Sequence, residues 1–251
     1  MRLLPDGRRL HLNHGPIDLI IEAFGLPGEV EAAYCRAQKS FPSILPKLVE
    51  ELHQLRKPLT KENELTGPVA KRMVKECEFY SPKFFLTPMA AVAGAVADEI
   101  LEMMLVGTNL DKAYVNNGGD TAFFLTPGEK LIIGLVTDFH LPNLDARCTI
   151  EYENSIRGIA TSGWKGRSHS LGIADSVTVL AKTGAGADVA ATLIANEVNV
   201  QHSAINRKIA SDLDPDSDLR FRKVTVDVGL LDEVSINIAL DRGEKAAIKA
   251  K

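Results

Sequence analysis

The sequence V-N-N-G-G-D-T-A-F-F, residues 115–124, places two asparagines, two glycines and one aspartate between apolar residues. An Asn-Gly pair in this setting is the strongest short-range indication of a tight β-hairpin. Paired glycines followed by an acid also let a ligand approach the backbone closely, because no side chain stands in the way. The stretch therefore predicts a hairpin, and it leaves open whether the turn also forms the floor of a ligand site.

Short strand-like runs continue on both sides of this hairpin, separated by Gly, Pro and Asn. They predict an antiparallel sheet between residues 112 and 180, with strands at 113–115, 122–125, 131–136, 148–152, 158–161 and 176–180. Residues 2–24 predict a further hairpin or meander. After the sheet we expect a helix at 187–196, a polar loop that includes 212–219, a strand at 224–228 and a helix at 231–250 interrupted by Gly243.

Three helices are predicted before residue 110, at 28–55, 68–77 and 88–107. Pro42 and Pro46 should break or kink the first. Thr87 can cap the third and Pro88 fits its first turn, and the many small residues of this helix allow another element to approach closely. Helices grouped before strands favour an α+β fold with an antiparallel sheet and packed helices over a doubly wound α/β fold.

The composition narrows the class of protein. A chain of 251 residues suits one domain, 1–251, with two fused subdomains at about 1–110 and 111–251 as an alternative. The net charge of -4 argues against nucleic-acid binding. Three scattered cysteines predict buried free thiols, and no apolar run suits a signal peptide or a membrane span, so we expect a soluble cytoplasmic protein without a membrane partner. The sequence leaves homo-oligomerisation open.

Two polar clusters could carry chemistry. Asp188 and Thr192 are four residues apart and share one helix face, where their oxygens could bind Mg²⁺. The alternative is an acid that favours its own helix N-terminus and a threonine bonded to its own backbone. A-T-S-G-W-K-G-R-S, residues 160–168, offers Lys165 and Arg167 to a phosphate, with a polar hairpin around a packed tryptophan as the alternative. His169, beside this cluster, is the acid/base candidate.

Segments of the chain occur in an order that resembles the ApbE-like flavin transferases, which move FMN from FAD onto a protein threonine. They are M-A-A-V-A-G-A-V-A-D-E-I at 89–100, A-Y-V-N-N-G-G-D at 113–120, I-A-T-S-G-W-K-G-R at 159–167 and S-V-T-V-L-A-K-T-G-A-G-A-D-V-A-A-T at 176–192. This resemblance covers about 85–195. Over nearly its whole length the chain resembles an uncharacterised family of ApbE-related proteins with H-G-P-I-D-L-I-I, here 14–21, near the start.

The resemblance implies a T-fold-like α+β architecture that binds FAD, FMN or a related small-molecule nucleotide near the Gly-Gly-Asp turn. The residues that match the nucleotide motifs are Asp98, Asn117, Gly118, Gly119, Asp120, Thr161, Ser162, Gly163 and Arg167. Asp188 and Thr192 match the motif that holds Mg²⁺ at the pyrophosphate. The implied activities are Mg²⁺-dependent FAD cleavage or FMN transfer.

The chain also departs from the transferase pattern. Ala93 stands where the transferases have lysine, the loop before Ser176 is shorter, and His169 matches their histidine only loosely. Nucleotide and metal binding can therefore persist without protein flavinylation. The alternative function is a non-catalytic, oligomeric T-fold module that binds a purine- or pterin-like ring.

Overall fold

The computed structural model describes residues 2–59, 65–81, 83–135 and 146–251. Its main sheet has seven strands, all paired antiparallel, in the order β1 (Arg2–Leu3), β2 (Leu10–His14), β3 (Ile17–Gly25), β4 (Leu110–Asn117), β5 (Asp120–Leu125), β8 (Gly158–Ser162) and β9 (Val177–Ala181). Two antiparallel ribbons accompany it, β6 (Lys130–Leu135) with β7 (Ala146–Glu151) and β10 (Ile205–Ile209) with β11 (Lys223–Val228). The predicted strand at 131–136 corresponds to β6, and Val136 lies outside the described residues.

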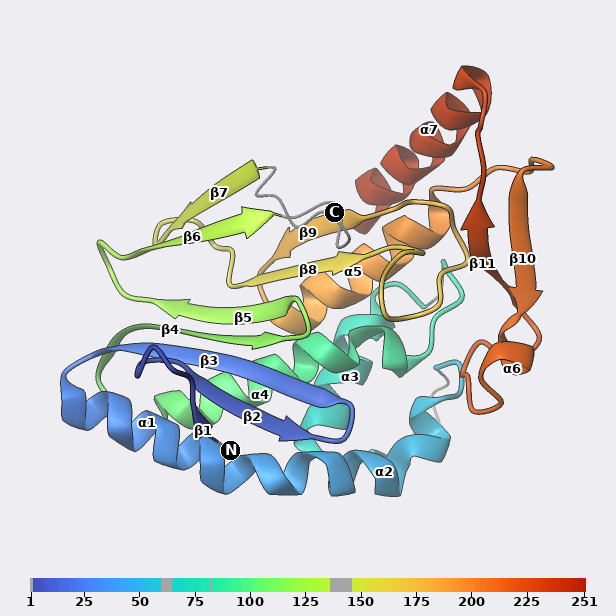
Figure 1. Cartoon of the computed structure of the whole chain (residues 1–251). Helices are drawn as coiled ribbons and strands as arrows, with labels where there is room; N and C mark the ends of the chain where they lie inside the picture. Colours follow the sequence, from blue (N-terminus) through green and yellow to red (C-terminus); the bar gives the residue numbers. More distant parts are fainter. Residues whose placement is uncertain (1, 60–64, 82, 136–145) are drawn as a thin grey trace.

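Helices cover one face of this sheet, while the β6–β7 ribbon lies on the other and the β10–β11 ribbon projects beside α7 (Figure 1). The helical elements are α1 (Pro27–Ser40), η1 (Phe41–Ser43), α2 (Ile44–Leu55), α3 (Pro68–Glu78), η2 (Pro88–Ala91), α4 (Val92–Leu105), α5 (Gly184–Glu197), α6 (Ala210–Leu213) and α7 (Glu233–Ala250). The predicted α+β class with an antiparallel sheet is confirmed. Among the described residues, no helix has both the length and the apolar character needed to cross a bilayer.

The hairpin predicted at residues 115–124 joins β4 to β5. Asn117 pairs with Asp120, so Gly118 and Gly119 alone form the turn. Their φ angles are +65° and +121°. Two-residue hairpin turns that follow the twist of the strands require positive φ, which glycine adopts without strain.

The central strands bury apolar side chains on both faces, because successive side chains point to opposite sides. Ile21 and Val115 face the helices and belong to the largest core cluster. Phe123 and Leu125 face the β6–β7 ribbon and pack with Ile150. The sheet is therefore an inner layer between helices and a smaller ribbon.

Several local predictions need correction. Only Pro42 breaks the first helix, since Pro46 lies in the first turn of α2, where its missing N–H is tolerated. Thr87 does not cap the helix it precedes, because its hydroxyl donates to Asp218 instead. Gly243 does not interrupt α7, and a Cβ there would lie 2.3 Å from Val198 Cγ2, so glycine permits close packing.

Two further predictions fall short. The stretch expected to be loop contains β10 and α6, which carry no strong periodicity in the sequence. The expected burial of the cysteines holds for Cys77, whereas Cys148 is half-buried and Cys35 is exposed; all three are free thiols.

Candidate functional site

A cavity of about 480 Å³ lies where α4, α5 and the hairpin turn meet. It brings together residues that are distant in sequence and that the motifs singled out: Asp120, Arg167, His169, Asp188 and Thr192. The remaining predicted residues, Asp98, Asn117, Gly118, Gly119, Thr161, Ser162 and Gly163, are not among its lining residues. The cavity thus joins the two sequence clusters into one site.

Asp188 is held at the start of α4 rather than at the start of its own helix. The backbone N–H of Gly94 donates to Asp188 Oδ2 at 3.0 Å. This contact is possible because α4 and α5 touch through glycines: a Cβ on Gly94 would lie 2.2 Å from the carbonyl oxygen of Gly184. Since α5 begins at Gly184, earlier than predicted, Asp188 lies beyond its first turn. The interpretation of Asp188 as a cap for its own helix is therefore wrong.

The N-terminus of α5 is capped by other residues. The hydroxyl of Thr183 accepts the N–H of Gly186 at 2.9 Å. Asp98, on α4, accepts the N–H groups of Gly184 at 2.8 Å and Ala185 at 2.9 Å. Its carboxylate, which the resemblance relates to the nucleotide, is occupied at a helix terminus and fixes the helix that carries Asp188.

Asp120 follows the hairpin turn and accepts the N–H of Thr161 at 3.2 Å. Burial raises the pKa of Asp120 to about 7. Burial, followed by repulsion from the Asp120 carboxylate, raises the pKa of Asp188. Both side chains are half-buried and line the cavity. Two neighbouring carboxylates in a poorly solvated place repel one another, so a cation between them would stabilise their charged forms.

The hairpin is tied to both halves of the site. Asn117 Nδ2 donates to the carbonyl oxygen of Ala93 at 3.1 Å, which fixes the turn against the start of α4. On the other side, a Cβ on Gly118 would lie 2.8 Å from Arg167 Nη1. The absence of a side chain at Gly118 therefore leaves room for the Arg167 guanidinium, which is exposed.

The cluster at residues 160–168 divides between a structural part and the cavity. Trp164 Nε1 and Lys165 Nζ donate to Asp175 at 2.9 Å and 3.0 Å, as expected for a polar turn around a packed ring. Arg167 and Ser168, with the exposed His169 after them, line the cavity. Lys165 is thus committed to Asp175, whereas Arg167 is the cation that can meet a phosphate.

One wall of the cavity comes from residues that the sequence did not single out. Asp214, Asp216 and Asp218 lie in the loop between α6 and β11, and Arg56 follows α2. Arg56 Nη1 is 3.9 Å from Asp216 Oδ1, and Asp218 accepts the Thr87 hydroxyl. The run D-L-D-P-D-S-D-L, residues 212–219, is part of the predicted polar loop, but nothing local relates it to α4, more than 100 residues away.

The residues present fit a hard cation. Among the described residues, no group of three or more His, Cys, Asp or Glu side chains is arranged as a metal site. Asp188, Asp120 and Thr192 instead offer a few oxygens to the cavity. Mg²⁺ suits such a site, because it takes one or two carboxylates and completes its octahedron with water and substrate phosphate.

Comparison with known proteins finds similarity to proteins described as UPF0280 proteins. A UPF0280 protein of Methanothrix thermoacetophila is 39% identical over 132 residues, 52% of either chain. A UPF0280 protein of Methanothermobacter thermautotrophicus is 35% identical over 167 residues, 65% of this chain and 61% of the relative. The chain thus spans about half to three-fifths of the curated relatives that it matches. The model of a family described as AbpE bacteria matches residues 1–251, so the chain belongs to this family.

Proposed function

We propose that this protein binds a flavin nucleotide, FAD or FMN, through its phosphates together with Mg²⁺. The observation that supports the proposal is the shared cavity of Asp120, Arg167, Asp188 and Thr192. Asp188 and Thr192, helped by Asp120, would hold Mg²⁺, which neutralises phosphate charge and polarises its oxygens when bound. Arg167 would meet the same phosphates by charge-assisted hydrogen bonds.

The charge of the cavity argues that metal and nucleotide bind together. Its lining includes five aspartates, at 120, 188, 214, 216 and 218, against the two arginines Arg56 and Arg167. A phosphate entering alone would meet an excess of negative charge, which acts strongly where solvent is scarce. We therefore expect nucleotide affinity to depend on Mg²⁺.

The chemistry that we propose for the site is Mg²⁺-dependent cleavage of FAD or transfer of FMN, with His169 as the acid/base group. His169 is exposed at the cavity wall, within the same lining as Asp188. Ala93 leaves no ammonium group at the start of α4, so the binding step is the better supported part of the proposal. We further propose a T-fold-like architecture and a cytoplasmic location, supported respectively by the antiparallel sheet and by the free cysteines.

Calorimetric titration of FAD with and without Mg²⁺ tests this function. We expect binding to strengthen at least about tenfold with Mg²⁺. Asp188→Asn should remove that gain, while Asp241→Asn, on the exposed side of α7, should keep it. Incubation with FAD and Mg²⁺ should then either release FMN and AMP together, if water attacks the pyrophosphate, or release AMP and add the mass of FMN to a protein, if a protein hydroxyl attacks it. Absence of FAD and FMN binding under both conditions would contradict the proposal and favour a non-catalytic oligomeric module for a purine- or pterin-like ring.

A pair of glycines isolates the contribution of Arg167. Gly118 and Gly7 have φ angles of +65° and +68°, so alanine strains the backbone equally, by about 1 kcal/mol. A Cβ at Gly118 would displace Arg167, whereas a Cβ at Gly7 meets nothing within 4 Å. We expect Gly118→Ala, and not Gly7→Ala, to weaken FAD binding about threefold. If Gly118→Ala and Gly7→Ala bind FAD with equal affinity, Arg167 does not contact the phosphates.

A further inference from the structure

The face of the main sheet turned away from the helices carries a second cleft, of about 660 Å³. Its floor consists of side chains from β3 and β4, and its wall is β6. This volume is within the range that small-molecule sites occupy. The cleft shares no lining residue with the cavity of Asp188, so a ligand here would be independent of the nucleotide.

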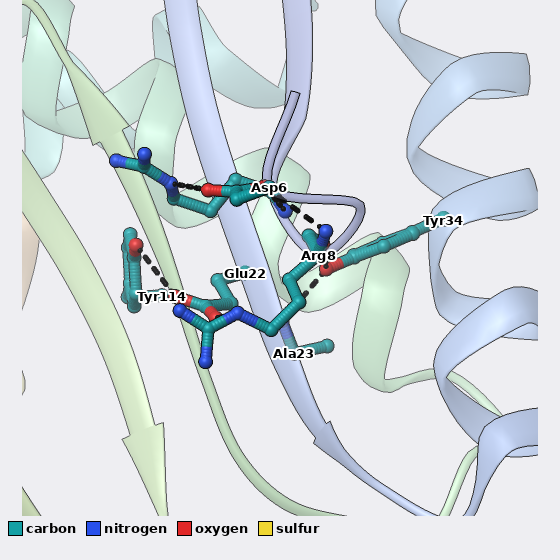
Figure 2. Close-up of polar contacts among 7 residues, drawn as sticks. Asp6, Arg8, Glu22, Ala23, Tyr34 and Tyr114 are labelled. Carbon is teal, nitrogen blue, oxygen red and sulfur yellow. Dashed lines mark hydrogen bonds and ion pairs between the residues drawn. The ribbon is translucent and has the colours of Figure 1, made fainter. Parts of the chain in front are cut away.

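The floor of the cleft is fixed by a polar network. Glu22 and Tyr114 are cross-strand partners, and the Tyr114 hydroxyl donates to Glu22 Oε2 at 3.0 Å. Arg8 Nε lies 3.6 Å from Glu22 Oε1, and Figure 2 shows Arg8 and Tyr114 on either side of the Glu22 carboxylate. The Tyr34 hydroxyl donates to the Arg8 carbonyl oxygen and accepts the N–H of Ala23. Glu22 is buried and already satisfied, so it orients the Tyr114 ring without requiring a ligand.

Cations outnumber anions around this floor. Arg9, Lys112 and Lys130 line the cleft, and Glu22 is the one carboxylate among its lining residues; Arg9 is paired with Asp6, outside the lining, at 2.5 Å. Lys112 Nζ lies 4.7 Å from the centroid of the Phe24 ring and donates to Glu129 at 2.9 Å. The ion pair with Glu129, which does not line the cleft, holds the Lys112 ammonium in place beside the aromatic floor.

The rest of the lining is apolar. Ile20 and Phe24 rise from β3, and Leu131, Ile132 and Ile133 form the wall. Ile132 is 60% exposed, although it lines the cleft. A ligand with an apolar body would cover surface that now meets water, which is favourable in proportion to the area removed.

We propose that this cleft binds a small amphipathic anion, a molecule with an aromatic or aliphatic body and one carboxylate, sulfonate or phosphate group. The body would lie on Phe24, Tyr114 and the β6 wall, and the anionic group would meet Lys112 and Lys130. The excess of cations selects the sign of the charge, and the neighbouring apolar residues select the body.

Two fluorescent probes with the same aromatic body test this proposal: 8-anilinonaphthalene-1-sulfonate, which is anionic, and N-phenyl-1-naphthylamine, which is neutral. We expect saturable binding of the sulfonate that is about fivefold weaker in Lys112→Met/Lys130→Met, with the neutral probe changed less than about twofold. Lys208→Met, outside the cleft on β10, is the matched control and should change neither probe.

A second variant locates the probes. Asn116 lines the floor, and Asn116→Trp should fill the cleft and weaken both probes, with circular dichroism confirming the fold. FAD with Mg²⁺ should displace neither probe, which separates this site from the nucleotide cavity. The proposal is overturned if the double variant binds the sulfonate unchanged, if Asn116→Trp leaves both probes bound, or if FAD with Mg²⁺ displaces them.

Discussion

The nucleotide cavity and the cleft on the other face of the sheet hold their charges in opposite ways. In the cavity, Asp120 and Asp188 lie near one another, and their pKa values are raised because burial disfavours their charged forms. In the cleft, Glu22 has both Tyr114 and Arg8 as partners. Carboxylates that repel one another need a cation from outside, whereas a carboxylate that the chain already satisfies leaves the neighbouring cations of the cleft to a ligand.

The largest effect should come from the contact that creates the cavity. Gly94→Ala would place a Cβ 2.2 Å from the Gly184 carbonyl oxygen, so the backbones of α4 and α5 must separate. We expect a loss of about 3 kcal/mol in the free energy of unfolding, measured with urea, together with loss of Mg²⁺-dependent FAD binding.

The control for this variant is Gly28→Ala, in α1, where a Cβ meets nothing within 4 Å. Alanine favours helices over glycine, so its stability should stay equal or rise slightly. If Gly94→Ala proves as stable as Gly28→Ala, the two helices do not depend on a glycine contact, and the cavity has another origin.

The raised pKa of Asp120 predicts how stability depends on pH without metal. The folded pKa of Asp120, about 7, lies above the ordinary aspartate pKa of 3.8, so the folded state binds more protons between these pH values. Protonated Asp120 therefore contributes a few kcal/mol to the unfolding free energy. This contribution is complete below about pH 4 and is lost as pH rises through about 7. As pH rises from about 4 to about 7, the unfolding free energy of the wild type should therefore fall relative to that of Asp120→Asn.

Mg²⁺ should reverse this loss, because it stabilises the charged pair of Asp120 and Asp188. Asp241→Asn, an exposed change on α7, should leave the pH profile as it is in the wild type. A profile that Asp120→Asn leaves unaltered would mean that the two carboxylates are well solvated, and the contrast between the cavity and the cleft would disappear.

How far the sequence predicts this arrangement depends on how local each signal is. The Gly118-Gly119 turn was predictable, because positive φ at both positions leaves glycine as the unstrained choice. The hydrogen bond between Asp188 and the start of α4 could not be predicted. The sequence around Asp188 is the same whether its carboxylate accepts an N–H of its own helix or of another helix. The prediction that Thr87 caps a helix is wrong for the same reason. A threonine before a proline is typical of a helix cap, whereas its partner Asp218 is distant in sequence and is brought close only by the fold.

The same distinction applies to the walls of the cavity. The order of the motifs predicts Asp120, Arg167 and Asp188 as parts of one site, and all three line the same cavity. The acidic loop at 214–219 connects β10 and α6 to β11, and of these three elements the sequence predicts only β11. Tertiary packing determines that this acidic loop lines the cavity, and local sequence patterns carry no information about that packing.

A smaller effect should follow from supplying the missing positive charge inside the cavity. Ala93 lines the cavity and precedes Gly94, whose backbone N–H donates to Asp188, so Ala93→Lys brings an ammonium close to the two carboxylates. We expect a gain of about 1 to 2 kcal/mol in unfolding free energy at pH 8 without Mg²⁺, and FAD binding that no longer needs the metal. Ala93→Met adds similar bulk without charge and should show neither change. Equal behaviour of the two variants would contradict the charge imbalance.

The smallest effect should come from the cleft, where the buried carboxylate of Glu22 already has partners within the chain. Tyr114→Phe removes the hydroxyl that donates to Glu22 and leaves Arg8 at 3.6 Å as its partner. Glu22 keeps Arg8, whose side chain is largely exposed, as a partner. We therefore expect the unfolding free energy, measured with urea, to fall by only about 1 kcal/mol. The aromatic ring stays in the floor, so affinity for 8-anilinonaphthalene-1-sulfonate should change less than about twofold. A loss as large as that of Gly94→Ala would show that Glu22 depends on one partner, and the cleft would then resemble the cavity in holding a charge that the chain alone cannot balance.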